Sequence, residues 1–260
     1  MVDETQSKSP SGATCENPVF IVGAPRSGTT LMRQILDAHP SILCPPWETG
    51  FFLHVGAMMA GDLPSVMGNA ENRFPLTRTQ LTDWLRESCD SLFARFSEIA
   101  DKPRWAEKTP GHVHHMDLIA TVFPGAQFIH MLRNGYDVVR SLKHTTWAPR
   151  SSAWRISTWI ESVDAGRRCG EALGTQQYIE LRYEELIESP EEQVRRLCGF
   201  LNEEFTPAML QFHKPDHNSW NSEVAPLQSK PLNKTRPLGF CEKTLVQWRA
   251  GRLMRSLGYR

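Results

Sequence analysis

The chain has 260 residues, of which 40% are hydrophobic and 22% charged, proportions that allow a sizeable buried core. Its 29 basic and 29 acidic side chains balance to a formal net charge of zero, and no run of Lys or Arg exceeds two. Sequence-independent nucleic-acid binding needs a basic surface, so the composition argues against a nucleic-acid partner. Any cationic site must be local and concave.

The cysteines and the apolar stretches of the sequence bear on metal sites and on membrane spans. The six cysteines form no C-x-x-C pair, so we expect buried thiols and no structural zinc site. Residues 1–17 lack the apolar segment of a signal peptide, and no apolar stretch reaches the roughly 18 residues of a membrane span. We therefore expect a flexible N-terminal tail over residues 1–17, no membrane span and a cytoplasmic protein.

The most informative segment lies near the start of the chain. An apolar run at 19–22 predicts a strand, a glycine-bounded loop follows, and apolar residues then recur at helical spacing as far as the proline at position 40. Gly23 and Gly28 are separated by four residues, as in a Walker loop, but Thr29 stands where a nucleoside triphosphatase has Lys. The cation is Arg26, inside the loop. We interpret this segment as a phosphate-binding loop that is not built for the γ-phosphate of ATP.

Residues 45–105 read as an irregular insertion. They are rich in Pro, Gly, Asn and aromatic residues, and the pattern predicts one helix over 81–99. Insertions beyond the carboxyl ends of strands commonly shape a substrate mouth, and we expect that role for this segment.

A second series of strands and helices follows. The sequence predicts strands over 128–132 and 178–183, a helix after each of them, and further helices over 153–173 and 242–257. Ser189, Pro190 and Glu192 predict a capping box at the start of the helix after the last strand. Strands that alternate with helices predict an α/β fold with a mainly parallel central sheet flanked by helices, in one domain over residues 18–260.

A second set of hydrogen-bond donors occurs at another predicted turn from strand to helix. Arg133 and Ser141 are eight residues apart there. An Arg after a strand is more often a surface salt-bridge partner, so this pair by itself is weak. Together with the first loop it predicts a ligand that carries phosphates at two separated positions.

In these motifs the chain resembles the sulfotransferases that use 3′-phosphoadenosine 5′-phosphosulfate (PAPS), which have a P-loop-like domain. It is most similar to tyrosylprotein sulfotransferases and their bacterial relatives, over roughly residues 18–260. The segments that carry the likeness are RSGTTLMR (26–33), LDAHP (36–40), Glu48-Thr49, Lys108-Thr109-Pro110, Arg182-Tyr183-Glu184 and Leu257-Gly258-Tyr259.

The resemblance implies a role for each matching residue in donor binding. The first loop corresponds to the 5′-phosphosulfate loop, and Arg133 with Ser141 corresponds to the 3′-phosphate motif. Tyr183 corresponds to a position beside the adenine, although a Tyr at the end of a strand could equally belong to the core. The residues of the first loop are Arg26, Ser27, Gly28, Thr29 and Thr30, and those of a looser match, a second loop closing over the 3′-phosphate, are Lys234, Thr235 and Arg236.

The same resemblance implies two catalytic residues. Glu48 corresponds to the family's general base, and Lys108 corresponds to the Lys that meets the oxygen bridging phosphate and sulfate. From the residues alone, Glu48 could be an ordinary surface carboxylate and Lys108 a solvated side chain in a turn. The acceptor is expected to be a hydroxyl on a small molecule or a tyrosyl peptide.

Two departures bear on the acceptor and the base. Gly50 follows Glu48-Thr49 where peptide-modifying members have Arg, and Phe51 and Phe52 come next, so a peptide acceptor is possible but not implied. Pro110 stands where cytosolic phenol and steroid sulfotransferases have a catalytic His.

Histidines are the remaining candidates for a base or a metal ligand. We read His112, His114 and His115 as an exposed turn, and His213 and His217 flank a Pro-Asp pair that spoils a helical metal-binding spacing. No metal is predicted.

Two other functions stay open. The first is an ATP-dependent P-loop kinase, which is disfavoured by Thr29 and by the lack of an apolar strand that ends in Asp. The second is a non-catalytic nucleotide-binding relative. The sequence leaves the oligomeric state open.

Overall fold

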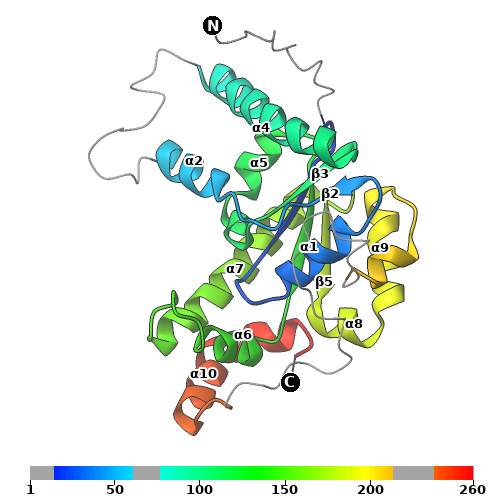
Figure 1. The fold of residues 1–260 in the computed structure, drawn as a ribbon. Helices are drawn as coiled ribbons and strands as arrows, with labels where there is room; N and C mark the ends of the chain where they lie inside the picture. The colour runs from blue at the N-terminus through cyan, green and yellow to red at the C-terminus, as the bar shows by residue number, and fades with distance from the viewer. Residues whose placement is uncertain (1–14, 61–76, 213–236, 260) are drawn as a thin grey trace, which may run out of the picture.

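The computed structural model describes residues 15–60, 77–212 and 237–259. Within them, five parallel strands form a sheet with the order β2-β3-β1-β4-β5 (Figure 1). The strands are β1 (Val19–Gly23), β2 (Ile42–Leu43), β3 (Arg104–Lys108), β4 (Gln127–Leu132) and β5 (Tyr178–Arg182). The predicted α/β fold is confirmed, with a sheet that is wholly parallel in the described part of the chain.

Helices cover both faces of this sheet (Figure 1). One apolar core lies between the sheet and α1, α8 and α9, a second packs α2, α4 and α5 against the opposite face, and a third joins α6, α7 and α10. The helices are α1 (Thr29–Asp37), α2 (Phe51–Ala60), α4 (Arg78–Ala100), α5 (Met116–Val122), α6 (Gly135–Leu142), α7 (Ser152–Leu173), α8 (Tyr183–Glu188), α9 (Pro190–Leu201) and α10 (Phe240–Ser256), with short 3₁₀ helices η1 (Pro110–His114) and η2 (Pro207–Leu210).

The central strand of the sheet is β1, and all five of its residues are buried. It pairs with β3 on one side and with β4 on the other, so the chain crosses from one side of β1 to the other between β3 and β4. Parallel α/β proteins bind ligands outside the carboxyl ends of their strands at such a reversal of strand order. The topology therefore places a candidate site beyond β1, β3 and β4.

The strands that the sequence predicts are β1, β4 and β5, whereas β2 and β3 are not predicted. Strand β3 lies at the end of the segment read as irregular, and it carries three charged side chains, at Arg104, Glu107 and Lys108. An inner strand of a parallel sheet usually reads as a continuous apolar run. These charges hide the strand because their partners come from distant parts of the chain.

Helical predictions are right in position and less accurate at the ends. The helix predicted over 81–99 is α4, which starts three residues earlier at a capping box formed by Thr77 and Gln80. The capping box predicted at Ser189 is wrong, because its side chain makes no capping hydrogen bond. The Ser189 backbone N–H instead donates to the Glu185 carbonyl at the end of α8. The same residue therefore ends α8 and precedes α9.

Two glycines of α7 allow this helix to approach the sheet closely. A Cβ at Gly166 would lie 2.4 Å from the His130 ring, and a Cβ at Gly170 would lie 2.3 Å from the Tyr178 ring. His130 and Tyr178 are neighbours on β4 and β5, with the His130 Nδ1 2.6 Å from the Tyr178 hydroxyl. The two rings therefore fill the space that side chains on α7 would otherwise occupy.

The substitution Gly166→Ala is expected to lower the free energy of unfolding by about 1–3 kcal/mol, because the new methyl group would overpack the buried His130 ring. The matched control is Gly199→Ala in α9, where a Cβ would meet no atom within 4 Å. Alanine there should leave stability unchanged or raise it by up to about 1 kcal/mol. Urea unfolding measures both, and equal effects of the two changes would contradict close packing of α7.

Candidate functional site

A cavity of about 690 Å³ opens beyond the carboxyl ends of β1, β3 and β4. The structure thus brings together residues that are far apart in the sequence. Those predicted to bind the donor or to act in catalysis and found in the cavity wall are Arg26, Gly28, Thr29, Thr30, Glu48, Arg133 and Tyr183, and the others that line it are Pro25, Leu53, Thr109, Pro110, Gly111 and Trp147.

The loop between β1 and α1 has a tight backbone. Arg26 and Gly28 both have positive φ, 73° and 100°. A Cβ at Gly28 would lie 2.5 Å from the Tyr183 ring, so only glycine fits between this loop and the start of α8. The buried Ser27 turns inward, where its N–H and its hydroxyl both donate to the Ala24 carbonyl.

The loop leads directly into the N-terminus of α1. Gly28 is the N-cap and offers no side chain, so the amides of the first turn have no capping partner from it. Thr29 and Thr30 in this turn both line the cavity. A helix N-terminus with free amides and a positive dipole end favours an anion at this position.

The second predicted donor set meets the first one. Arg26 Nε donates to Ser141 Oγ at 3.0 Å, and Arg133 donates to the Arg26 carbonyl at 3.0 Å. The Arg133 guanidinium also lies over the Tyr183 ring, 4.3 Å from its centroid. Because of these contacts, the loop after β1, the turn after β4 and the start of α8 form a single wall, and Arg133 is not a simple surface ion-pair partner.

The two predicted catalytic side chains are also in contact. Lys108 Nζ donates to Glu48 Oε1, although the residues are 60 positions apart. Lys108 is 4% exposed at the end of β3, so it is not the solvated side chain that a Lys-Thr-Pro turn suggests. The Glu48 side chain is half-exposed and lines the cavity. Glu48 thus faces the cavity, and the buried Lys108, which is not itself among the lining residues, reaches it only through this contact.

The expectation of an exposed histidine turn is wrong for His112, which is fully buried. Its Nε2 accepts a hydrogen bond from the Phe52 N–H at 3.2 Å, and its Nδ1 lies 2.9 Å from Glu107 Oε2. Both ring nitrogens face partners inside the core, and the ring does not line the cavity, so His112 is not placed to meet an acceptor. Burial lowers the pKa of His114 and of His115 below the usual value for histidine.

Some residues of the site are missed by the sequence reading. Trp147, which is 59% exposed, lines the cavity from the segment between α6 and α7. Glu107 is buried on the opposite side of β3 from Lys108. Successive residues of a strand point to opposite faces of the sheet, so Glu107 and Lys108 could have been assigned to opposite faces from the sequence. That assignment would have required β3 to be recognised first.

Other predicted residues cannot be placed. Lys234, Thr235 and Arg236, predicted to close over a 3′-phosphate, lie outside the described residues, as do His213 and His217. No group of three or more His, Cys, Asp or Glu side chains in residues 15–60, 77–212 and 237–259 could hold a metal ion. Among the helices described, none is both long and apolar enough to cross a membrane.

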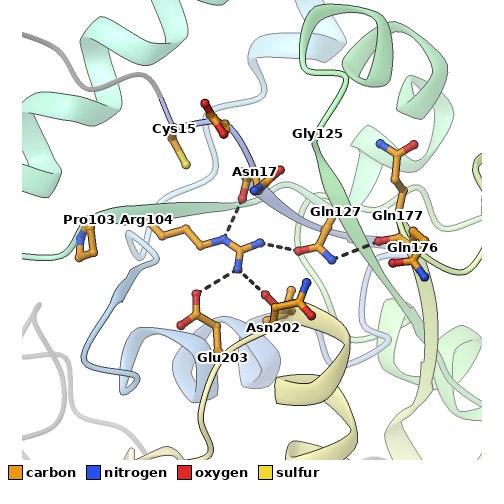
Figure 2. A pocket seen from close by; sticks show the side chains of 12 residues that line it. Cys15, Asn17, Pro103, Arg104, Gly125, Gln127, Gln176, Gln177, Asn202 and Glu203 are labelled. Atoms are coloured by element: carbon orange, nitrogen blue, oxygen red, sulfur yellow. Dashed lines mark hydrogen bonds and ion pairs between the residues drawn. The ribbon is translucent and has the colours of Figure 1, made fainter.

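A second cavity, of about 520 Å³, lies at the amino ends of β1, β3, β4 and β5 and contains no predicted site residue (Figure 2). Figure 2 shows Arg104 at its centre, where the guanidinium donates to the Asn17 and Leu201 carbonyls and to the side chains of Glu203 and Gln127. These bonds connect β3 with β4 and with the end of α9. We interpret this Arg as a structural clamp, since four of its five N–H donors are already used.

Comparisons with known proteins identify the family of the chain. A model of the sulfotransferase family matches residues 18–207. A putative protein-tyrosine sulfotransferase from Caenorhabditis briggsae is 30% identical over 205 residues, which are 76% of this chain and 70% of that protein. The protein-tyrosine sulfotransferase of Drosophila melanogaster is 29% identical over 198 residues, 74% of this chain but only 39% of that protein.

A solved structure is similar over nearly its whole length. The sulfotransferase domain of the olefin synthase from Synechococcus PCC 7002 superposes with a TM-score of 0.64, at 21% identity, over 98% of this chain and 99% of that domain. At this identity the likeness concerns the fold. The family match covers most of the chain and includes both donor-bearing turns, and the chain therefore belongs to the sulfotransferase family.

Proposed function

We propose that this sulfotransferase moves the sulfuryl group of PAPS to an acceptor hydroxyl. The observation that supports this most directly is the joining of two donor-rich turns in one cavity. The bonds from Arg26 to Ser141 and from Arg133 to Arg26 connect them. A ligand with anionic groups at two positions, such as PAPS, suits such a wall better than one with a single phosphate.

Each part of the wall then has a role. Arg26 and the amides at the start of α1 hold the 5′-phosphosulfate, while Arg133 and Ser141 hold the 3′-phosphate. Tyr183, already stacked on Arg133, offers an aromatic face to the adenine. The residues proposed to bind the donor are Arg26, Gly28, Thr29, Thr30, Arg133, Ser141 and Tyr183, with Lys234, Thr235 and Arg236 from the segment that is not described. Ser27, expected from the sequence to bind the donor, instead shapes the loop, because its N–H and hydroxyl both donate to the Ala24 carbonyl.

Catalysis follows from the pair at the cavity wall. Glu48 accepts the proton of the acceptor hydroxyl while the new O–S bond forms and the bond from sulfur to the bridging oxygen breaks. Lys108 offsets the negative charge that develops on that oxygen as adenosine 3′,5′-bisphosphate leaves. Their mutual contact supports this assignment, because it places both groups within reach of one reacting centre. No metal takes part in this scheme, so turnover should persist in a strong chelator.

The acceptor is proposed to present its hydroxyl on an apolar body. Leu53, Pro110 and Trp147 give the cavity an apolar rim beside Glu48. Gly50 offers no cation for an acidic peptide at that point. Small phenols or alcohols fit this rim, and tyrosyl peptides remain in the class because curated relatives are named protein-tyrosine sulfotransferases.

Calorimetry with adenosine 3′,5′-bisphosphate tests the donor assignment. Binding of this product, with no binding of ATP in the presence of magnesium, is the expected result. Tight binding of ATP and magnesium without the bisphosphate would instead support a kinase. Transfer of labelled sulfate from PAPS to a panel of phenols, sugars and tyrosyl peptides would then separate an enzyme from a non-catalytic relative and identify the acceptor class.

Arg133→Ala is expected to weaken binding of adenosine 3′,5′-bisphosphate by about 10- to 100-fold, because it removes a charge-assisted hydrogen bond. The matched control is Arg195→Ala on α9, since Arg195 also stacks on an aromatic ring, 4.0 Å from the Phe205 centroid, outside the cavity. That control should bind the bisphosphate like the wild type. Unchanged affinity in Arg133→Ala would remove Arg133 from the donor site.

A further inference from the structure

A buried carboxylate lies next to Lys108 on the strand that carries it. Glu107 is 3% exposed and pairs in register with Phe20 of β1, inside the aromatic core that includes Trp105. Burial works to raise the pKa of Glu107, but hydrogen bonds from His112, Thr109 and Thr49 outweigh it and hold this pKa below its usual value. A buried charge is retained only where such partners compensate for its desolvation.

The partners of Glu107 come from the turn that contains Glu48. Glu107 Oε1 accepts hydrogen bonds from the Thr49 N–H at 3.2 Å and from the Thr49 hydroxyl at 2.9 Å. It also accepts one from the Thr109 hydroxyl at 2.6 Å. One carboxylate oxygen therefore connects the residue after Glu48 with the residue after Lys108.

The two hydroxyls extend this network to the next amides of the turn. Thr109 Oγ1 accepts from the Gly50 N–H, and Thr49 Oγ1 accepts from the Phe51 N–H, both at 3.2 Å. Each hydroxyl donates to Glu107 and accepts from the backbone, so the direction of every hydrogen bond is set by the charge of the carboxylate.

His112 completes the set from the other carboxylate oxygen. Because Nε2 accepts from the Phe52 N–H, the ring proton is on Nδ1, which faces Glu107 Oε2 at 2.9 Å. The four consecutive amides of residues 49–52 thus all donate to side chains in the Glu107 network. These amides include the start of α2, so strand β3 and η1 cap this helix from outside.

We propose that Glu107 is a positioning residue: it fixes the turn that carries Glu48 relative to Lys108. This inference relies on the proposed function for the catalytic roles of those two residues. Glu48 depends on its turn for its position, because it is half-exposed and its own side chain contacts only Lys108 among the hydrogen bonds described. A general base must be held within hydrogen-bond reach of the acceptor, and a displacement of 1 Å can lower the rate by about 100-fold.

The first test measures the position of the turn without any substrate. In Glu107→Gln, the amide has one acceptor oxygen, so it cannot accept both from His112 Nδ1 and from the Thr49 and Thr109 hydroxyls. In Thr49→Val the hydroxyl is lost with little change of shape. Both should speed hydrogen exchange of the amides of residues 49–52 by about tenfold, the equivalent of one charge-assisted hydrogen bond. Thr49→Ser restores the hydroxyl and should restore protection.

The matched control for loss of a buried polar network is His39→Gln. His39 is 2% exposed and both its ring nitrogens are hydrogen-bonded, to the Glu204 carbonyl and the Ser41 N–H, at the far end of α1. This change should lower stability and leave exchange at residues 49–52 unchanged. Unchanged exchange at these amides in Thr49→Val would overturn the proposal, even if Glu107→Gln fails to fold.

The second test asks whether the position of the turn affects turnover through Glu48. Thr49→Val should lower kcat about tenfold and change the affinity for adenosine 3′,5′-bisphosphate less than twofold, with rescue by Thr49→Ser. In a Glu48→Gln background, Thr49→Val should have no further effect on kcat, because the group it positions is already gone. An equal loss in both backgrounds would overturn positioning through Glu48.

The two tests separate this inference from the proposed function. Normal turnover in Glu48→Gln would refute the assignment of the base and, with it, the catalytic purpose of the network. The exchange experiment would still decide whether Glu107 holds the turn. A protein that binds no bisphosphate but shows the expected exchange would refute only the proposed function.

Discussion

Glu48→Gln is expected to lower kcat by about 10²- to 10⁴-fold, the range typical for loss of a general base. The amide keeps the size of the side chain and its hydrogen bond from Lys108, but it cannot accept the proton of the attacking hydroxyl. Binding of adenosine 3′,5′-bisphosphate should change less than twofold, because Glu48 makes no hydrogen bond or ion pair to the β1–α1 loop in the described structure. Release of this product from PAPS, in the presence of the best acceptor of the panel, measures the loss.

The control for this change is Glu191→Gln. Glu191 is exposed to a similar degree, 58% against 50% for Glu48, and is also ion-paired, to Arg195 on α9. It should keep normal turnover. If Glu48→Gln retains near-normal kcat, another group takes the proton, and His112 is not a candidate because it is buried and does not line the cavity. An equal loss of turnover and of bisphosphate affinity would make Glu48 a structural residue.

Lys108→Met is expected to lower kcat/KM by about 10²- to 10³-fold, the range measured when one preorganised charge-stabilising donor is removed. Methionine matches the length of the side chain and its burial, so the change removes mainly the positive charge next to the leaving oxygen. Loss should fall on kcat more than on donor affinity, since the charge on the bridging oxygen grows in the transition state. Steady-state kinetics with PAPS as the varied substrate separates the two parameters.

Lys102→Met provides the matched control. Lys102 is another largely buried Lys, 11% exposed and 3.6 Å from Asp37, but it precedes β3 rather than ending it. Its ammonium donates to the Asp37 and Ile42 carbonyls, contacts that bind structural elements together. Its loss should lower the melting temperature and spare kcat/KM. A similar loss of kcat/KM in both variants would show that Lys108 acts through stability alone.

Local sequence predicts the loop after β1 and the turn after β4 well because both are short and contiguous. The glycines at 23 and 28 and the apolar strand before them predict the β1–α1 loop, and the structure has it there. The same is true of the turn after β4. In both cases the backbone geometry depends on neighbours within a few residues, so the pattern is visible in the sequence.

The contact between Glu48 and Lys108 is harder to read because its partners come from distant segments. Glu48 and Lys108 meet across 60 residues, and β3 carries charges that hide it as a strand. His112 looks like part of an exposed turn until Glu107 and the Phe52 amide are placed around it. These partners pair only after the chain has folded, so no local pattern reports them.

The sequence by itself determined the parallel α/β class, the glycine-bounded loop after β1 and the likeness to sulfotransferases, since periodicity and short motifs carry all three. Only the tertiary structure decided that Arg26 and Arg133 share one wall, that Lys108 is buried against Glu48, and that Glu107 accepts hydrogen bonds from the residue after Glu48. The physical reason is that a buried charge is stable only beside its partners, and those partners are brought together by the sheet order rather than by the order of the chain.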